Sequence, residues 1–362
     1  MELGERGLVM EKVLESDHIL VDAVDPHAGV LVCHHRDTHL IGYVHLHTLE
    51  PTELASEAHV TWTELEHGQN ILCALKAPLF AYDISGSHLG AKGGLRLFRV
   101  VHLLESRIVS DHELPELCTA FAFDHLGHVW TADAEGFVYT HTLEPPTVYR
   151  QQLPLDAQKK PQQAVSLCAL PPDTDTGSGA VIVAATQTHV HMLANGGFEA
   201  QSTPLPEEIQ QKPRDILVEI EGTRAGPIPI PSHDEVDYVW QVRCFAGGVV
   251  VLLQNSVLVK GRTGAGEWLH IANLPCIMDA VQLCPRTGTL ALSHINGDVF
   301  VVHPSTPERA PTVLTPRRDA VLGRKADANS HMMCAQKTKG GWVIYAARTE
   351  GMVDAGAFSE KK

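Results

Sequence analysis

The side chains in this sequence with the clearest capacity for chemistry are its 22 histidines. Imidazole binds transition metals, and two histidines on one face of a strand can chelate an ion. The densest cluster, CHHRDTHLIGYVHLH, contains His34, His35, His39, His45 and His47. The pairs His45–His47 and His189–His191 have the same-face spacing of a strand. Because no carboxylate recurs at a fixed offset and HExxH is absent, we expect exposed strand histidines, with a metal site as the alternative.

Other signatures of catalysis are missing from the sequence. It contains no GxSxG nucleophile motif and no P-loop. Asp25 and Asp124 occupy matching places just before a turn, where a carboxylate typically accepts hydrogen bonds from turn amides. Acids and histidines from distant parts of a chain can assemble into a catalytic site, which is the catalytic alternative for these two residues. We predict a protein that is not an enzyme, with no catalytic residues, no bound metal and no cofactor.

The elements that carry these residues repeat along the chain. The motif HTLEP occurs at residues 47–51 and again at residues 141–145, 94 residues later. Each copy follows a strand, a tight turn, a second strand and a polar turn. The motif then ends a third strand, and we expect it to start the connection from one repeat to the next. Glycines recur nine residues apart in two places, at Gly127 and Gly136 and at Gly288 and Gly297. Each pair brackets one short strand, VWTA or LALS, and glycine suits the two flanking turns because such turns often need positive φ.

The cysteines show a second repeat of similar length. Six of the eight open a β run, namely Cys73, Cys118, Cys168, Cys244, Cys284 and Cys334, at spacings of 45, 50, 76, 40 and 50 residues. A unit of 40 to 50 residues with about four strands is typical of a propeller blade. We expect these thiols to pack where blades converge, with a soft-metal site as the alternative. No CxxC motif is present, and we expect reduced thiols.

The repeats therefore predict an all-β fold. We expect a single β-propeller domain over residues 1–362, with seven blades of four antiparallel strands. The blades begin near Ile19, Asn70, Leu117, Val165, Trp240, Asp279 and Ser330. The last unit is short, and the N-terminal run GLVMEKVL supplies its missing strand and closes the ring.

This pattern resembles the seven-bladed WD40-like propellers over nearly the whole chain. The GH and WD dipeptides of that family are absent, since Trp130 precedes Thr131 and Trp240 precedes Gln241, so its Asp-His-Ser/Thr-Trp network does not carry over. A second resemblance is to RCC1-like propellers, in the stretch beginning VWQVRCFAGG at residue 239 and, more loosely, in the one beginning at residue 62. Gly261 fits part of the RCC1 pattern, but the GQLG ending is missing, and the exchange activity of that family has no matching residues.

Two segments interrupt the repeat and are candidates for binding partners. Residues 207–237 form an acidic, proline-rich insertion between blades, and residues 304–329 form a basic inter-blade loop. Both are solvated loops in the simpler interpretation. The candidate partner-binding residues in these segments are Glu207, Glu208, Asp234 and Glu235, and Arg317, Arg318, Arg324 and Lys325. The basic set suits RNA phosphate or an acidic protein.

Composition narrows the possible partners. The formal charge of the chain is -15, which disfavours general binding to nucleic acids or membranes. We find no signal peptide and no apolar run long enough to span a bilayer, so we expect a cytoplasmic or nuclear protein.

The predicted function is a non-catalytic scaffold for protein–protein interaction in a multisubunit complex. The alternatives are an accessory subunit of an RNA-modifying or RNA-containing assembly and a propeller hydrolase with a channel metal.

Overall fold

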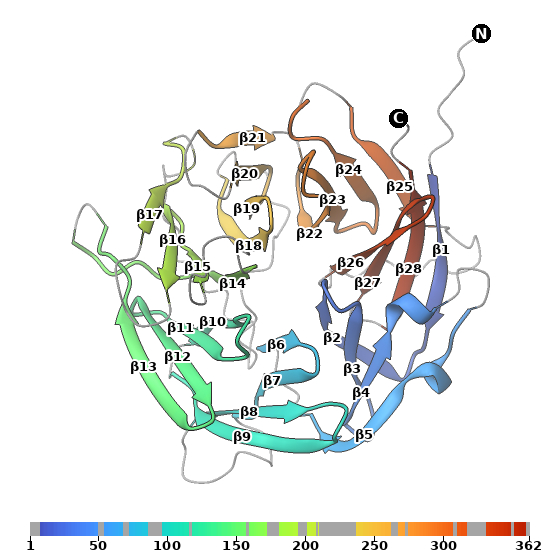
Figure 1. Ribbon diagram of the computed structural model, residues 1–362, viewed down its shortest axis with the longest axis horizontal. Helices are drawn as coiled ribbons and strands as arrows, with labels where there is room; N and C mark the ends of the chain where they lie inside the picture. Colours follow the sequence, from blue (N-terminus) through green and yellow to red (C-terminus); the bar gives the residue numbers. More distant parts are fainter. Residues whose placement is uncertain are drawn as a thin grey trace. The chain divides into compact units, whose positions relative to one another are not determined.

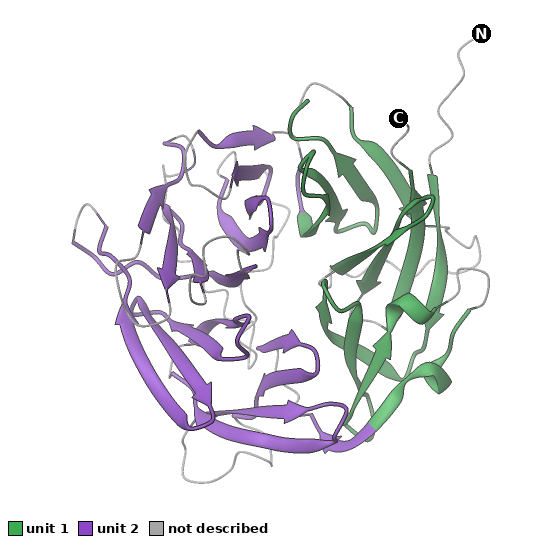
Figure 2. Ribbon diagram, in the orientation of Figure 1, with its two compact units in different colours: residues 1–62, 277–362 green, residues 63–276 purple. Residues whose placement is uncertain are grey.

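A computed structural model describes most of the chain. The described residues are 8–49, 54–67, 72–85, 96–115, 118–156, 159–171, 181–194, 201–207, 209, 237–261, 267–271, 274–306, 310–316, 331–348 and 351–359. They contain 28 β-strands and two short 3-10 helices, η1 (Leu46–Thr48) and η2 (Glu57–His59). The chain divides into two compact units, residues 63–276 and residues 1–62 with 277–362 (Figure 2). The expected all-β class is confirmed, whereas the expected single domain stays a prediction.

Residues 63–276 contain four sheets, each of four antiparallel strands in sequence order (Figure 1). The first sheet consists of β6 (Cys73–Lys76), β7 (Leu79–Asp83), β8 (Leu97–His102) and β9 (Arg107–Glu113). The second consists of β10 (Cys118–Phe123), β11 (Val129–Asp133), β12 (Phe137–Leu143) and β13 (Pro146–Gln152). The third consists of β14 (Ser166–Leu170), β15 (Val181–Ala185), β16 (His189–Ala194) and β17 (Gln201–Pro204). The fourth consists of β18 (Val239–Phe245), β19 (Gly248–Leu253), β20 (Val257–Gly261) and β21 (Leu269–Ile271).

The first strands of these four sheets lie next to one another in sequence order. Side chains join them directly: the Thr119 hydroxyl donates to the Ala164 carbonyl at 2.6 Å, and the Ser166 hydroxyl accepts from the Val242 amide at 3.1 Å. The apolar clusters of this unit each combine buried residues from two successive sheets. The core therefore lies between sheets, because each sheet has apolar side chains on both faces.

The other unit contains a four-stranded and an eight-stranded sheet. The four-stranded sheet consists of β2 (Ile19–Asp25), β3 (Val30–His35), β4 (Leu40–His45) and β5 (Thr61–Glu66), and the division between the units falls within β5. The eight-stranded sheet has the order β22 (Ile277–Cys284), β23 (Thr289–His294), β24 (Val299–Val302), β25 (Thr312–Pro316), β1 (Leu8–Glu15), β28 (Met352–Phe358), β27 (Gly341–Arg348) and β26 (His331–Thr338).

The N-terminal strand joins two antiparallel sets of four in this large sheet. β1 pairs antiparallel with β28, as the sequence predicted for the N-terminal run, and it pairs parallel with β25. The first strands β22 and β26 also lie side by side, and the Asp279 carboxylate accepts from the Met333 amide at 2.9 Å. β1 thus completes a set of four with β26, β27 and β28. Its parallel pairing with β25 joins this set to the set β22–β25, which makes one sheet of eight strands.

The repeat positions read from the sequence agree with the strands. All six recurring cysteines lie on the first strand of a four-strand set: β6, β10, β14, β18, β22 and β26. The eight cysteines are free thiols, and among the six recurring ones those at positions 118, 244 and 334 are buried. These three belong to apolar clusters of the core, which agrees with the packing role expected for them.

The predicted turn chemistry is also present. Asp25 accepts hydrogen bonds from the amides of His27 and Ala28 at 2.9 and 3.0 Å. Asp124 accepts from the amides of Leu126 and His128 at 2.8 and 3.0 Å. The four glycines of the nine-residue pairs all have positive φ, between 68° and 93°. Both aspartates therefore hold turns, which confirms the hydrogen-bonding role that the sequence predicted for them.

Three details differ from the expectations or lie beyond the described residues. Both HTLEP copies precede the fourth strand of a sheet, so the motif marks a connection inside a sheet, and the predicted start of a connection from one repeat to the next is wrong. Residues 312–316, inside the expected basic loop 304–329, form β25, because Val313 and Thr315 continue a paired strand. Residues 210–236 of the acidic insertion lie outside the described part of the chain.

Candidate functional site

The histidine pair His45 and His47 does not share a strand face. β4 ends at the exposed His45, and the chain then enters η1, so the alternation of a strand stops there. The His47 ring lies 5.9 Å from the Tyr345 ring, and its Nε2 is buried without a hydrogen-bond partner. Burial, together with the neighbouring His45, lowers the pKa of His47. The prediction that these two residues share a strand face is therefore wrong.

The second pair, His189 and His191, does share a face of β16, with ring centroids 5.7 Å apart. His191 is fully buried, its Nδ1 lies 2.8 Å from the Ser202 hydroxyl, and desolvation lowers its pKa to about 4. His189 Nδ1 lies 2.9 Å from the Thr188 hydroxyl. Hydroxyl groups thus occupy one nitrogen of each ring, and the pair serves as a neutral packed element of the sheet.

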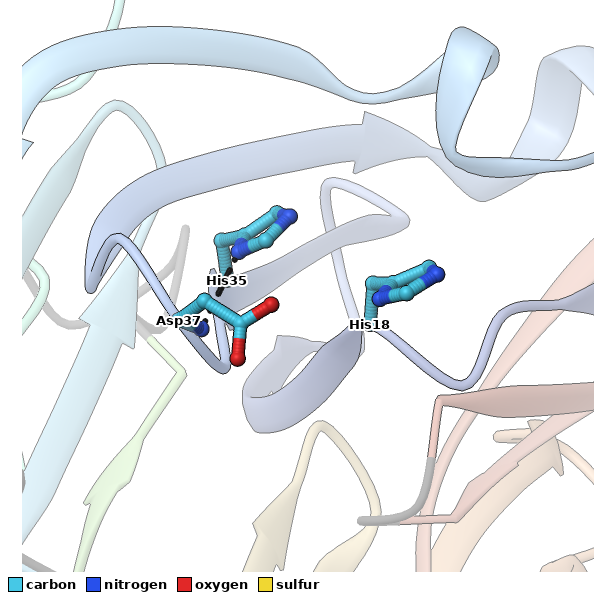
Figure 3. A group of neighbouring side chains, drawn as sticks. All are labelled: His18, His35 and Asp37. Carbon is cyan, nitrogen blue, oxygen red and sulfur yellow. Dashed lines mark hydrogen bonds between the residues drawn. The ribbon is translucent and has the colours of Figure 1, made fainter.

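A different group of potential ligands gathers at one end of the β2–β3 pair (Figure 3). His18 precedes β2, His35 is the last residue of β3, and Asp37 follows in the β3–β4 turn. One ligand atom from each lies within 4.8 Å of the other two. The two imidazole rings are stacked, with centroids 5.9 Å apart and planes 10° from parallel. Two imidazoles and a carboxylate form a donor set suited to Zn²⁺ and related ions.

The backbone accounts for this meeting of residues distant in sequence. Ile19 pairs with His35 in the antiparallel ladder, and the Arg36 amide donates to the His18 carbonyl at 2.8 Å. His18 therefore lies beside the end of β3, one residue before the partner of His35. His18 and Asp37 are exposed, and His35 is half-buried against Trp62, with ring centroids 5.6 Å apart.

His35 already uses one of its nitrogens. Nδ1 accepts from the backbone amides of Asp37 at 3.1 Å and Thr38 at 3.3 Å, which shapes the turn after β3. In the neutral ring, the proton then resides on Nε2. An ion that binds His35 must therefore take the place of these two amides or reverse the ring tautomer.

The exposed edge of the second sheet is a further candidate surface. β13 is its last strand, and the large side chains Val148 and Tyr149 are 54% and 62% exposed. Arg150 is the only charged residue among the seven of β13, and its guanidinium lies 3.5 Å from the centroid of the Phe137 ring. An outer strand with an unpaired backbone edge, few charges and exposed large side chains is a template for pairing with another strand.

The candidate partner-binding residues predicted from the sequence lie almost entirely outside the described part of the chain. Glu207 is described and exposed. The others, Glu208, Asp234, Glu235, Arg317, Arg318, Arg324 and Lys325, lie outside the described residues. The structure therefore brings none of this set together, and their roles stay predictions.

A buried aromatic cluster joins the first and second sheets of residues 63–276. The His141 ring lies 4.8 Å from Phe98 and 5.6 Å from His112, measured between centroids. His141 Nε2 lies 3.1 Å from the Thr131 hydroxyl, and its Nδ1 is buried without a partner. Desolvation, with a smaller effect from His112, lowers the pKa of His141 to about 3. This second HTLEP histidine is therefore a neutral core residue.

Comparison with known proteins adds no assignment. Neither the models of protein families nor the curated proteins contain a match to this chain. Neither described helix has the length and apolar character that a bilayer crossing requires.

Sequence reasoning identified the histidine-rich segment but missed two members of the ligand group. His18 lies outside that segment, and no spacing rule connects it with His35. A signal was available for Asp37, because HHRD places a carboxylate two residues after His35. The pairing of Ile19 with His35 is the information that was needed.

Proposed function

We propose that the chain is a seven-bladed β-propeller of a degenerate WD40-like type that acts as a non-catalytic scaffold for protein partners. The 28 strands and the two antiparallel sets of the eight-stranded sheet support this proposal, because five sheets of four and one of eight make seven sets of four. Within each unit, the adjacent first strands and the cores between successive sheets are also typical of propellers.

The observation that carries the scaffold role is the exposed outer edge of β13. The other outer strands of residues 63–276 have features that discourage pairing: β17 and β21 have only four and three residues, and β9 carries several charges. β13 has seven residues, one charge and two exposed large side chains. We infer that a partner docks by adding an extended segment along β13, with backbone hydrogen bonds and with Val148 and Tyr149 as contacts.

The test is affinity purification of the tagged full chain from cells at native expression. We expect stoichiometric partners with the wild type and loss of at least one with Val148→Glu combined with Tyr149→Glu. Ile108→Glu is the matched control, because Ile108 is 45% exposed on the outer strand β9 of the neighbouring sheet. A monodisperse monomer with no partner would refute the scaffold role. Equal recovery of all partners by the β13 variant and the control would refute the assignment to β13.

A further inference from the structure

We propose that His18, His35 and Asp37 form a binding site for a divalent transition-metal ion, and that Zn²⁺ is the ion the donor set fits best. This site is independent of the proposed scaffold role and of the β13 edge. It lies at the end of the β2–β3 pair where the chain enters β2 and leaves β3 (Figure 3).

The backbone positions of the three residues are set before any ion binds. The β2–β3 ladder fixes His35 opposite Ile19, and the bond from the Arg36 amide to the His18 carbonyl fixes the residue before β2. The turn after β3 is held by the His39 amide, which donates to the His35 carbonyl at 2.9 Å. Only side-chain rotations are then needed for binding, which keeps the ordering cost low.

The donor atoms are close enough for such rotations to complete the site. They lie within 4.8 Å of one another, whereas ligands on a tetrahedral zinc ion are separated by roughly 3.3 Å at bond lengths near 2.0 Å. His18 and Asp37 are exposed, so both side chains can turn toward an ion without displacing core residues. The contraction therefore requires no movement of the strands.

The main free-energy cost of binding an ion is the loss of the hydrogen bonds to His35. An ion that takes the Nδ1 position displaces the amides of Asp37 and Thr38. Both residues are exposed, so water can satisfy these amides once the imidazole is withdrawn. The contact with Trp62 limits how far the His35 ring moves during this exchange.

The chemistry of the three donors selects the class of ion. Two imidazoles favour Zn²⁺, Cu²⁺ and Ni²⁺ over Mg²⁺ and Ca²⁺, which prefer oxygen ligands throughout. The single carboxylate supplies negative charge to the ion, and the acidic chain, with a formal charge of -15, does not repel it. Three protein ligands leave a position of the tetrahedral ion for water.

The experiment is calorimetric titration of the full chain with Zn²⁺, with Mg²⁺ as the comparison ion. We expect wild type to bind one equivalent of Zn²⁺ whose affinity falls at least ten-fold in His18→Ala and in Asp37→Ala. His27→Ala is the matched control, because His27 is an exposed histidine at the other end of the β2–β3 pair and lies outside the group. We expect this control to bind Zn²⁺ as wild type does.

His18→Gln provides a second variant that retains a polar side chain but lacks imidazole, and it should lose the same equivalent. Near-ultraviolet circular dichroism checks that each variant keeps its fold. The proposal is overturned if the wild type binds no Zn²⁺, if Mg²⁺ binds equally well, or if His27→Ala and His18→Ala change the titration to the same extent.

Discussion

The buried His141 makes the stability of residues 63–276 sensitive to mild acid. Its side chain is 1% exposed, and desolvation lowers its pKa to about 3 from the ordinary value of 6.5. A lowered histidine pKa means that the unfolded chain binds more protons than the folded chain between these two values. The stabilisation is therefore fully present above pH 6.5 and is lost as the pH falls toward 3.

The size of this pH effect follows from the difference in protonation of His141 between the unfolded and the folded chain. At pH 5.5, the unfolded imidazole is mostly protonated while the folded one stays neutral, which destabilises the fold. At pH 7.5, both states are mostly neutral, so this effect is small. His141 alone should thus lower the free energy of unfolding by about 1 kcal/mol between pH 7.5 and pH 5.5.

A double variant isolates this contribution. His141→Phe with Thr131→Val removes the titrating ring together with its buried hydroxyl partner, so no new unsatisfied group remains. Urea unfolding at pH 7.5 and 5.5 should show a pH-dependent loss of unfolding free energy about 1 kcal/mol smaller in this variant than in wild type. Thr131→Val alone keeps the imidazole and should retain the wild-type dependence. The reasoning is refuted if the double variant and wild type lose the same stability over this interval.

Three further changes test the packing of the same unit. Asp124→Ala removes the carboxylate that accepts from the buried Trp130 indole N–H, at 2.9 Å, and from two turn amides. This change should lower the free energy of unfolding in urea by about 3 kcal/mol. The double variant Asp124→Ala with Trp130→Phe should lose little more unfolding free energy than Asp124→Ala alone. Gln187→Ala removes both hydrogen bonds that its amide makes to β18 and should lower the unfolding free energy by about 2 kcal/mol, whereas unchanged stability would contradict a role in joining the third and fourth sheets. Gly248→Ala places a Cβ 2.0 Å from a backbone oxygen at φ +148°, and this strain should lower the free energy of unfolding in urea by about 3 kcal/mol. Gly261→Ala, where a Cβ meets open space, should leave it nearly unchanged.

The repeated elements were accessible from the sequence because they depend on local chemistry. Alternating apolar residues favour short strands, and glycines such as Gly127 and Gly288 permit the positive φ that the intervening turns require. The prediction that Asp124 holds a turn is local in the same sense, since its partners lie within six residues. The cysteine repeat located the first strands of six four-strand sets for a related reason: small apolar side chains suit strands packed against their neighbours.

The candidate sites depended on tertiary structure. The two HTLEP histidines have identical local sequence, yet His47 lies in a 3-10 helix and His141 lies in a buried strand. Likewise, His18 meets His35 only because the register of β2 and β3 brings Ile19 opposite His35. The strands, the turns and their repetition could be predicted from the amino-acid sequence, because they follow from each residue and its near neighbours. The burial of particular imidazoles, the approach of an imidazole to a carboxylate and the exposure of one strand edge required the three-dimensional structure, because they depend on the pairing of residues far apart in the chain.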